Sequence, residues 1–382
     1  MRIKLKTWIS LIIFFVGVVL TAWIYFSTSF TTKPIGVISD SRIKDELVNK
    51  TEDSYQNKDQ VRNQTLHIKV LSGKNKGKTY TLNNTYSPSQ AMSQKYYPHE
   101  RVVLSFINKK AKLMSPKRDW VVIFAITLVL SLLVAITGKH ASLLAFSMAI
   151  NSIIFYFVIK FDIAENGTKT FLIYGSAVVI FTLVSLLIVQ GLNTKMWVTL
   201  VATLLGVFVS FGICYAIMQV TGESGIKYEA VDYATQDPRA LFLAQTLLGV
   251  LGAVMDEATD IVSSLYALCQ HKKDLTFKAL FISGRTLGQE IMGPLINVLV
   301  LIFMAEALPM TILYLRDNNT LIYTFEFALS LGVIQSLISA IGIVLTVIFA
   351  TLTSGVFLNK NATSKEVREW QLYLPYYYYY LP

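Results

Sequence analysis

The feature that most constrains this chain is a series of eight apolar runs, each long enough to form a membrane-spanning helix. About 20 helical residues cross the roughly 30 Å of hydrocarbon in a bilayer. Of the 382 residues, 53% are hydrophobic and only 15% are charged, which is unlike an ordinary soluble domain. We therefore predict an all-α integral membrane protein with about eight transmembrane helices in contact with the lipid bilayer. The runs cover residues 8–26, 119–137, 141–159, 171–190, 196–218, 241–266, 285–308 and 325–355.

The first run follows three basic residues, Arg2, Lys4 and Lys6, and has no convincing small-residue cleavage site. We expect residues 1–26 to be an uncleaved anchor helix rather than a signal peptide. If the N-terminus is cytoplasmic, the short inner segments hold more Lys and Arg than the short outer loops, as the positive-inside rule requires. Both termini are then cytoplasmic. The inner set is Arg2, Lys4, Lys6, Lys139, Lys195, Lys272, Lys273, Lys278, Lys360, Lys365 and Arg368, and the outer set is Lys160, Lys169, Lys227, Arg239 and Arg316.

Residues 27–118 separate the first two apolar runs and should form a small domain outside the membrane. Their first part, residues 31–63, is polar with little periodicity, which predicts a flexible linker. Apolar and polar residues then alternate over 66–70 and again over 80–82, with the turn-rich SGKNKGK between them. This pattern predicts a β-hairpin, and RVVLSFI at 101–107 predicts a further strand. We expect a small β-domain inserted after the first helix.

This outer segment is strongly basic. It contains 17 Lys and Arg against 7 Asp and Glu, a net charge of +10 that equals the formal charge of the whole chain. Such a surface can meet anionic headgroups or cell-wall polymers, although a simply solvated surface explains the charge as well. No recognition motif accompanies the charge, so we expect no nucleic-acid partner.

Residues 119–357 form the predicted seven-helix membrane domain, and residues 358–382 form a cytoplasmic tail. The tail ends in LYLPYYYYYLP, an aromatic run that suits the membrane interface.

The usual signals of catalysis and cofactor binding are missing. The four histidines are scattered without ligand spacing, so we expect no metal. Neither GxxxxGK[ST] nor GxSxG occurs, so we expect neither a phosphate loop nor a serine hydrolase, and we assign no cofactor and no catalytic residue. An intramembrane aspartyl protease is a weaker alternative, because the nearest acids, Asp256 and Asp260, lie on one helix and GxGD is absent.

Several predicted helices carry a stripe of small and polar residues on one face. Small residues at such spacing usually let membrane helices pack closely, and this is the main interpretation for the Gly, Ser and Thr positions. The stripes are Gln245, Gly249, Gly252, Asp256, Asp260 and Ser263; Ser283, Thr286, Glu290, Gly293 and Asn297; Gln335, Ser339, Gly342 and Thr346; and Thr199, Thr203, Gly206 and Ser210.

Carboxylates in such stripes need a stronger reason, since an acid at mid-membrane costs about 2.5–3.5 kcal/mol even on insertion scales. We therefore predict that Asp256, Asp260, Glu290 and Asn297 line a path for a substrate or ion, while Glu257 points about 100° away from Asp256. The alternative is a buried structural network. The supporting residues are Gly252, Ser263, Arg285, Gln289, Gly293 and Pro294, of which Arg285 could reach Asp260 and Pro294 should kink or open its helix near Asn297.

These two helices contain the segments GVLGAVMD at 249–256 and GRTLGQEIMGPLIN at 284–297. In these two segments the sequence resembles the YibE/F-like family of bacterial membrane proteins, although Gln289-Glu290 stands where the family pattern has Arg-Asp. The segment KVLSGKNKGK is also similar to the longer members. The resemblance implies a multi-pass protein of the bacterial cell membrane with a presumed transport function, often encoded together with a related protein that would be its partner.

We therefore expect a secondary transporter or permease subunit and not an enzyme. The rival is a non-transporting scaffold or sensor, in which the outer domain binds a ligand or partner and the acids lock helices together.

Overall fold

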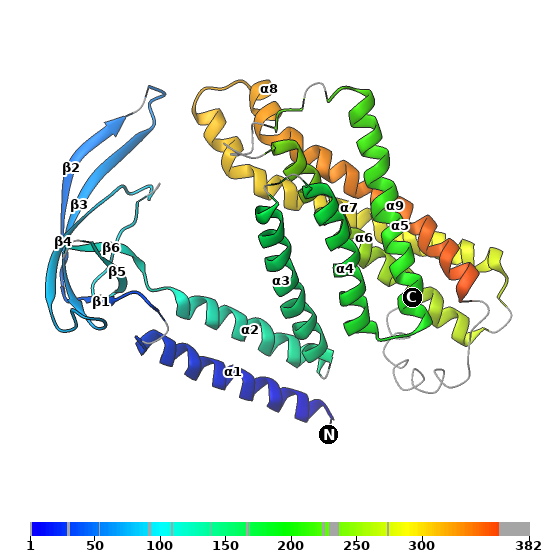
Figure 1. The fold of residues 1–382 in the computed structure, drawn as a ribbon, viewed down its shortest axis with the longest axis horizontal. Helices are drawn as coiled ribbons and strands as arrows, with labels where there is room; N and C mark the ends of the chain where they lie inside the picture. The colour runs from blue at the N-terminus through cyan, green and yellow to red at the C-terminus, as the bar shows by residue number, and fades with distance from the viewer. Residues whose placement is uncertain are drawn as a thin grey trace. The chain divides into compact units, whose positions relative to one another are not determined.

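The structure is a computed structural model that describes residues 2–28, 31–52, 54–90, 93–107, 110–138, 140–165, 167, 169–223, 226–228, 237–272 and 275–358, with side chains from residue 7 onward. These residues contain eight helical spans long and apolar enough to cross a membrane, and a small antiparallel sheet follows the first of them (Figure 1). The predicted fold class is therefore confirmed. The tyrosine-rich tail, predicted to sit at the membrane interface, lies outside the described residues.

The chain divides into two compact units, Met1–Ser142 and Leu143–Pro382. Each long helix contains most or all of one apolar run of the sequence, and α7 extends eight residues beyond its run at each end. The helices are α1 (Arg2–Phe26), α2 (Asp119–Thr137), α3 (His140–Ala164), α4 (Thr170–Gln190), α5 (Thr194–Val220), α6 (Pro238–His271), α7 (Phe277–Arg316), α8 (Leu321–Thr324) and α9 (Ser330–Phe357).

The sheet domain is built around one long central strand. Its strands are β1 (Ile35–Ile38), β2 (Lys44–Glu52), β3 (Lys58–Val70), β4 (Thr79–Tyr86), β5 (Arg101–Ile107) and β6 (Lys110–Pro116). They follow the order β2-β3-β1-β5-β6, and β4 also pairs with β3. The predicted hairpin is confirmed, since Leu66 pairs with Leu82 and Ile68 with Tyr80. Inward-facing side chains of β3 and β5, such as Leu66 and Leu104, form its core.

The prediction of a flexible linker over residues 31–63 is wrong. Strands β1, β2 and the first half of β3 occupy most of it. β2 is exposed along nearly its whole length and pairs with β3 from Lys44↔Thr65 to Glu52↔Lys58. Backbone hydrogen bonds of this kind need no apolar alternation, so a polar two-stranded ribbon leaves no periodic signal in the sequence.

The last carbonyl groups of α1 are bonded by two cations from the sheet domain. The guanidinium of Arg101 donates to the carbonyl oxygens of Tyr25 and Phe26, each at 2.8 Å. The ammonium of Lys117, a side chain only 1% exposed, donates to the carbonyl oxygen of Ile24 and pairs with Asp119 at 3.1 Å. A helix leaves its final carbonyls without intrahelical donors, and positive charge at that end is favourable. The sheet is thus joined directly to α1 and to the start of α2.

α1 and α2 pack tightly against each other. A side chain at Gly17 would overlap Thr127, so the glycine is what permits the close approach. Nearer the other end, the hydroxyl oxygens of Ser10 and Ser131 lie 3.1 Å apart.

Asp45 links three strands of the sheet domain. Its carboxylate accepts hydrogen bonds from Arg62 Nε at 2.8 Å and from the Tyr86 hydroxyl at 2.7 Å. Burial alone would raise the pKa of Asp45, but these hydrogen bonds and the charges of Arg62 and Lys95 outweigh it and lower the pKa below its usual 3.8. A carboxyl with a lower pKa in the folded state stabilises the fold above the unfolded pKa, and this stability is lost as the pH falls through the folded pKa.

We expect Asp45→Asn to reduce amide hydrogen-exchange protection of β2 and β3 about tenfold or more near neutral pH, because hydrogen bonds to a charged group contribute about 1.5–3 kcal/mol. The wild-type advantage should begin to decline as the pH falls below about 4, the unfolded pKa, and should be lost once the pH has passed the lower pKa of the folded carboxyl. Glu46→Gln is the matched control, because its ion pair with Lys44 is exposed and should contribute under about 1 kcal/mol. Equal losses in both variants would contradict the role of Asp45.

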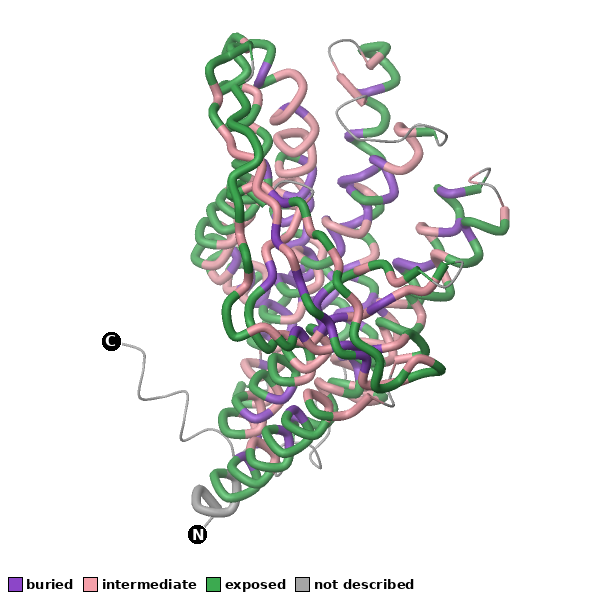
Figure 2. The backbone as a smooth tube through the Cα atoms, turned by 90° about the vertical axis from the view of Figure 1, so that its left-hand side faces the viewer, coloured by how far each residue is buried: buried purple, intermediate pink, exposed green. Residues whose placement is uncertain are grey.

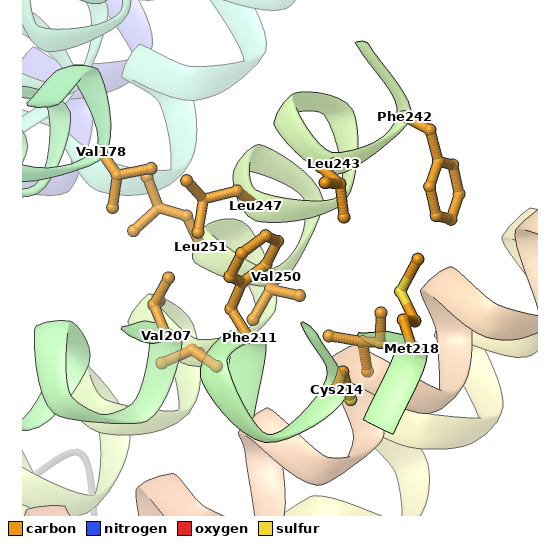
Figure 3. Packing of buried hydrophobic residues seen from close by; sticks show 12 residues of the cluster. Val178, Val207, Phe211, Cys214, Met218, Phe242, Leu243, Leu247, Val250 and Leu251 are labelled. Atoms are coloured by element: carbon orange, nitrogen blue, oxygen red, sulfur yellow. The ribbon is translucent and has the colours of Figure 1, made fainter. Parts of the chain in front are cut away.

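In the second unit, α9 packs against α5, α6 and α7, and α6 packs also against α4 and α5. Leu247, Val250 and Leu251 of α6 lie against Val207 and Phe211 of α5 in one continuous apolar cluster (Figure 3). Buried and exposed stretches alternate along the helices, as expected when each helix packs on one side only (Figure 2).

The last span is not one regular helix. Between α8 and α9, residues Phe325–Leu329 form a π-helical turn, labelled η2, in which Ser330 Oγ donates to the carbonyl oxygen of Glu326 at 2.5 Å. Such turns are rare and insert an extra residue into the helical ladder. By contrast, α7 remains helical through Pro294 and Pro309, so neither proline ends the helix.

Candidate functional site

α6 buries one face and leaves the predicted acidic face exposed. Val254, Ile261 and Leu265 are fully buried, whereas Asp256 and Asp260 are exposed. Gly252 is also exposed, and Ser263 is half-buried. The helical spacing that grouped Gly252, Asp256 and Asp260 in the sequence therefore also groups them in space, on the side of α6 away from its neighbours.

α7 shows the same arrangement. Its packed face consists of Leu280, Gly284 and Gly288, and side chains at the two glycines would overlap Thr351 and Val347 of α9. The predicted site residues of this helix are all exposed, namely Arg285, Gln289, Glu290, Gly293, Pro294 and Asn297.

The predicted site residues make few polar contacts with one another. Among the described residues, no hydrogen bond or ion pair joins Asp256, Asp260, Glu290 or Asn297, and none joins Arg285 to Asp260. Lys195 at the start of α5 interacts electrostatically with Asp260. The alternative of a buried structural network completed by Arg285, Gln289 and Asn297 is therefore wrong for these side chains.

The stripes of small residues behave differently on different helices. On α5 and α9 they are buried except for the half-buried Gln335, and a side chain at Gly206 would overlap Thr346 and lie 2.8 Å from Val254 Cγ1. On α6, a Cβ at Gly249 would lie 2.6 Å from Gln335 Nε2, whereas a Cβ at Gly252, or at Gly293 of α7, would meet no atom within 4 Å. The close-packing interpretation thus fits α5, α9 and the Gly249 end of the α6 stripe, while the faces at Gly252 and Gly293 remain open.

The sequence interpretation missed Glu257 as a candidate. This side chain is 0% exposed, and both its carboxyl oxygens lack a hydrogen-bond partner among the described residues. It is adjacent to Asp256 and three residues from Asp260, with which it interacts electrostatically. Its position about 100° from Asp256 placed it off the polar stripe, and nothing in the spacing alone indicates that this off-stripe position is the buried one.

The sheet domain has a polar hollow of about 540 Å³ bounded by β4, β6, Gln90 and residues 93–96. Beneath it, Gln64 donates to the carbonyl oxygen of Tyr96 at 3.0 Å and accepts from Asn84 at 3.2 Å. Lys112 and Ser93 also line the hollow. Its walls suit a polar ligand better than an apolar one.

The described residues contain no cluster of three or more His, Cys, Asp or Glu that could hold a metal ion. What the helices do offer is charge on exposed faces. A charged side chain in a membrane span faces water, a cavity or a partner rather than lipid. Asp256, Asp260 and Glu290 supply this charge on α6 and α7.

Comparison with known protein families gives two matches that together cover most of the chain. The model described as YibE/F-like protein matches residues 125–360, and the model described as YibE/F family N-terminal domain matches residues 29–116. The first covers the helices that carry the candidate site, and the second covers the sheet domain. Neither the curated proteins nor the solved structures give a match.

Proposed function

Because the chain belongs to the YibE/F-like family of multi-pass membrane proteins, we propose that it is a secondary transporter or the permease subunit of one. Asp256, Asp260, Glu290 and Asn297 line a water-filled path for a charged or protonatable solute. The proposal involves no making or breaking of covalent bonds in the solute, so the protein is not an enzyme.

The exposure of the charged residues on α6 and α7 carries this proposal. Asp256, Asp260 and Glu290 are exposed on helices that are long enough to span the bilayer. If they faced hydrocarbon, each would cost about 2.5–3.5 kcal/mol or more. A wet path removes that cost and supplies acidic ligands for a cation or a proton. Gly252 and Gly293 lie on the same faces and have no side chain, which leaves room for a solute beside the acids.

We propose that the membrane is a bacterial cell membrane, with both termini cytoplasmic and residues 27–118 outside. In this orientation the basic sheet domain meets anionic headgroups or cell-wall polymers. A paired, related membrane protein is the proposed partner that encloses the path where this chain leaves it open.

A second candidate function follows from the hollow of the sheet domain. In a membrane sensor, a polar ligand would bind between β4 and β6, beside Lys112 and Asn84. Such a sensor would lose its response without the domain, whereas a transporter would retain a wet path through α6 and α7.

Thiol labelling tests the transport proposal without knowledge of the solute. In a background with Cys214→Ser and Cys269→Ser, single cysteines at 256, 260, 290 and 297 should react with membrane-impermeant reagents, because a thiol ionises and reacts only where water reaches it. The matched control is Ile302→Cys. This apolar position is 52% exposed and lies about 140° around α7 from Asn297, so it should face lipid. Its thiol should therefore react at least about tenfold more slowly than the cysteines of the path. Unreactive cysteines at all four sites in folded protein would contradict a path.

A further inference from the structure

We propose that Glu257 binds a proton inside the helix bundle and that, in a role that rests on the proposed transport function, it exchanges this proton with the path. The inference begins with its burial. Glu257 is 0% exposed, and neither carboxyl oxygen has a hydrogen-bond partner among the described residues. No other Asp, Glu, Lys or Arg in the described part of the helix bundle is buried to this extent.

Burial without a partner selects the neutral form of the carboxyl group. Moving an ionised carboxylate into a medium of low dielectric constant has a large desolvation cost, and a substantial part of it remains after the protein relaxes. Burying a neutral acid without hydrogen bonds costs far less. Glu257 therefore holds a proton in this conformation.

The surrounding helices supply no charge that would change this result. α4 and α9 contain no Asp, Glu, His, Lys or Arg. α5 contributes only Lys195, which interacts with Asp260. No residue of α7 forms an ion pair with Glu257. The remaining charged groups on the elements around it are Asp256, Asp260, Arg239 and His271 of α6 and Lys278, Arg285, Glu290, Glu306 and Arg316 of α7.

A metal ion fits the position less well than a proton. Hard cations such as Mg²⁺ and Ca²⁺ take six or more oxygen ligands, and no cluster of three potential ligands exists among the described residues. A single carboxyl group in an apolar setting, next to Val254, Ala258 and Ile261, needs only a proton to become neutral.

The proton has a short route to the exposed face. Asp260 lies three residues further along α6, and side chains at this spacing have Cβ atoms about 5–6 Å apart. Transfer breaks the O–H bond of Glu257 and forms one on Asp260, so Glu257 becomes the carboxylate and Asp260 the neutral acid. By helical geometry the two side chains point about 60° apart. A rotation of α6 by about 60° would therefore bring Glu257 to the direction that Asp260 now faces.

Infrared difference spectroscopy of the full chain in detergent or liposomes tests the proton directly. The spectrum of wild type minus Glu257→Gln should contain the carbonyl-stretch band of a protonated carboxylic acid near neutral pH. The matched control is Asp260→Asn, in which the band should remain because Glu257 is unchanged. Loss of the band in Glu257→Gln alone supports the inference, and spectra without a protonated-acid band at Glu257 overturn it.

A second measurement uses only the wild-type protein, so it does not depend on a variant that folds. Dicyclohexylcarbodiimide reacts with protonated carboxyl groups in apolar surroundings, and peptide mass spectrometry locates the adduct. The adduct should form on Glu257 near neutral pH and not on Glu223. Glu223 lies outside the spans and pairs with Arg239 at 2.5 Å. Adducts on exposed acids with none on Glu257 would overturn the inference.

The two proposals can fail separately. A protonated Glu257 with unreactive cysteines along α6 and α7 would leave the proton site in place and remove the transport function. Reactive cysteines with an ionised Glu257 would leave the path and remove its proton carrier.

Discussion

Gly206→Leu should unfold the membrane domain at a markedly lower temperature, with a loss of about 3 kcal/mol or more in stability. A side chain at this position would overlap Thr346 of α9 and approach Val254 Cγ1 of α6 within 2.8 Å. Overpacking a close-packed core costs about 1–3 kcal/mol even where neighbours can adjust. Here two helices contact the glycine at once, so the added side chain forces α5 away from both.

The control lies on the same helix. A Cβ at Gly212 meets no atom within 4 Å, and this residue is exposed. Gly212→Leu should leave the melting temperature unchanged or raise it slightly, because glycine is a poor helix former by up to about 1 kcal/mol. Melting curves of the purified variants in one detergent provide the comparison. A similar loss at both positions would mean that the contacts of Gly206 with Thr346 and Val254 do not set the stability of α5.

Glu257→Met should stabilise the protein by about 1–3 kcal/mol, because it removes a buried polar group that lacks a partner and keeps a similar volume. Glu257→Lys should do the opposite and cost more than about 4 kcal/mol, since an ammonium there would be buried without an acceptor. Thermal unfolding in detergent measures both changes.

Glu290→Met is the matched control, because Glu290 is exposed and its replacement relieves no buried charge. Its melting temperature should stay close to that of the wild type. A loss of stability in Glu257→Met would mean that Glu257 has a favourable interaction in solution, and the neutral, unpartnered state inferred above would then be wrong. Residues that a function requires often make the folded protein less stable. A gain in stability on replacing Glu257 therefore agrees with a role for this residue in transport.

The helical part of the fold was predictable because a long apolar run in a membrane can form few structures other than a helix. The hairpin was predictable as well, since Leu66 and Ile68 alternate with polar residues across from Leu82 and Tyr80. The ribbon of β2 and β3 was not predictable, because its exposed strand is held by backbone hydrogen bonds and its polar residues resemble those of a linker.

The candidate site was predictable in its composition but not in its surroundings. Spacing alone placed Asp256 and Asp260 on one face of α6, and this is where the structure has them. Whether a face is buried depends on the neighbouring helices. The spacing of residues along one helix does not show which helices pack against it. The same limit explains why Glu257, one residue from Asp256, gave no sign of being the buried acid. It also explains why the π-helical turn at Phe325–Leu329 had no signal, as no proline or glycine marks it.

The bonds from Arg101 and Lys117 to the last carbonyls of α1 have a mechanical consequence. A domain on a long flexible tether turns freely, and any strain in it dissipates before it reaches the bilayer. Here the guanidinium of Arg101 also lies over the rings of Tyr25 and Phe26, at 5.1 and 5.2 Å from their centroids. With these contacts and the direct run of the chain from Lys117 into α2, the sheet is joined to α1 and α2 by side chains as well as by the backbone. We therefore expect a force on the sheet to be transmitted to α1 and α2 together.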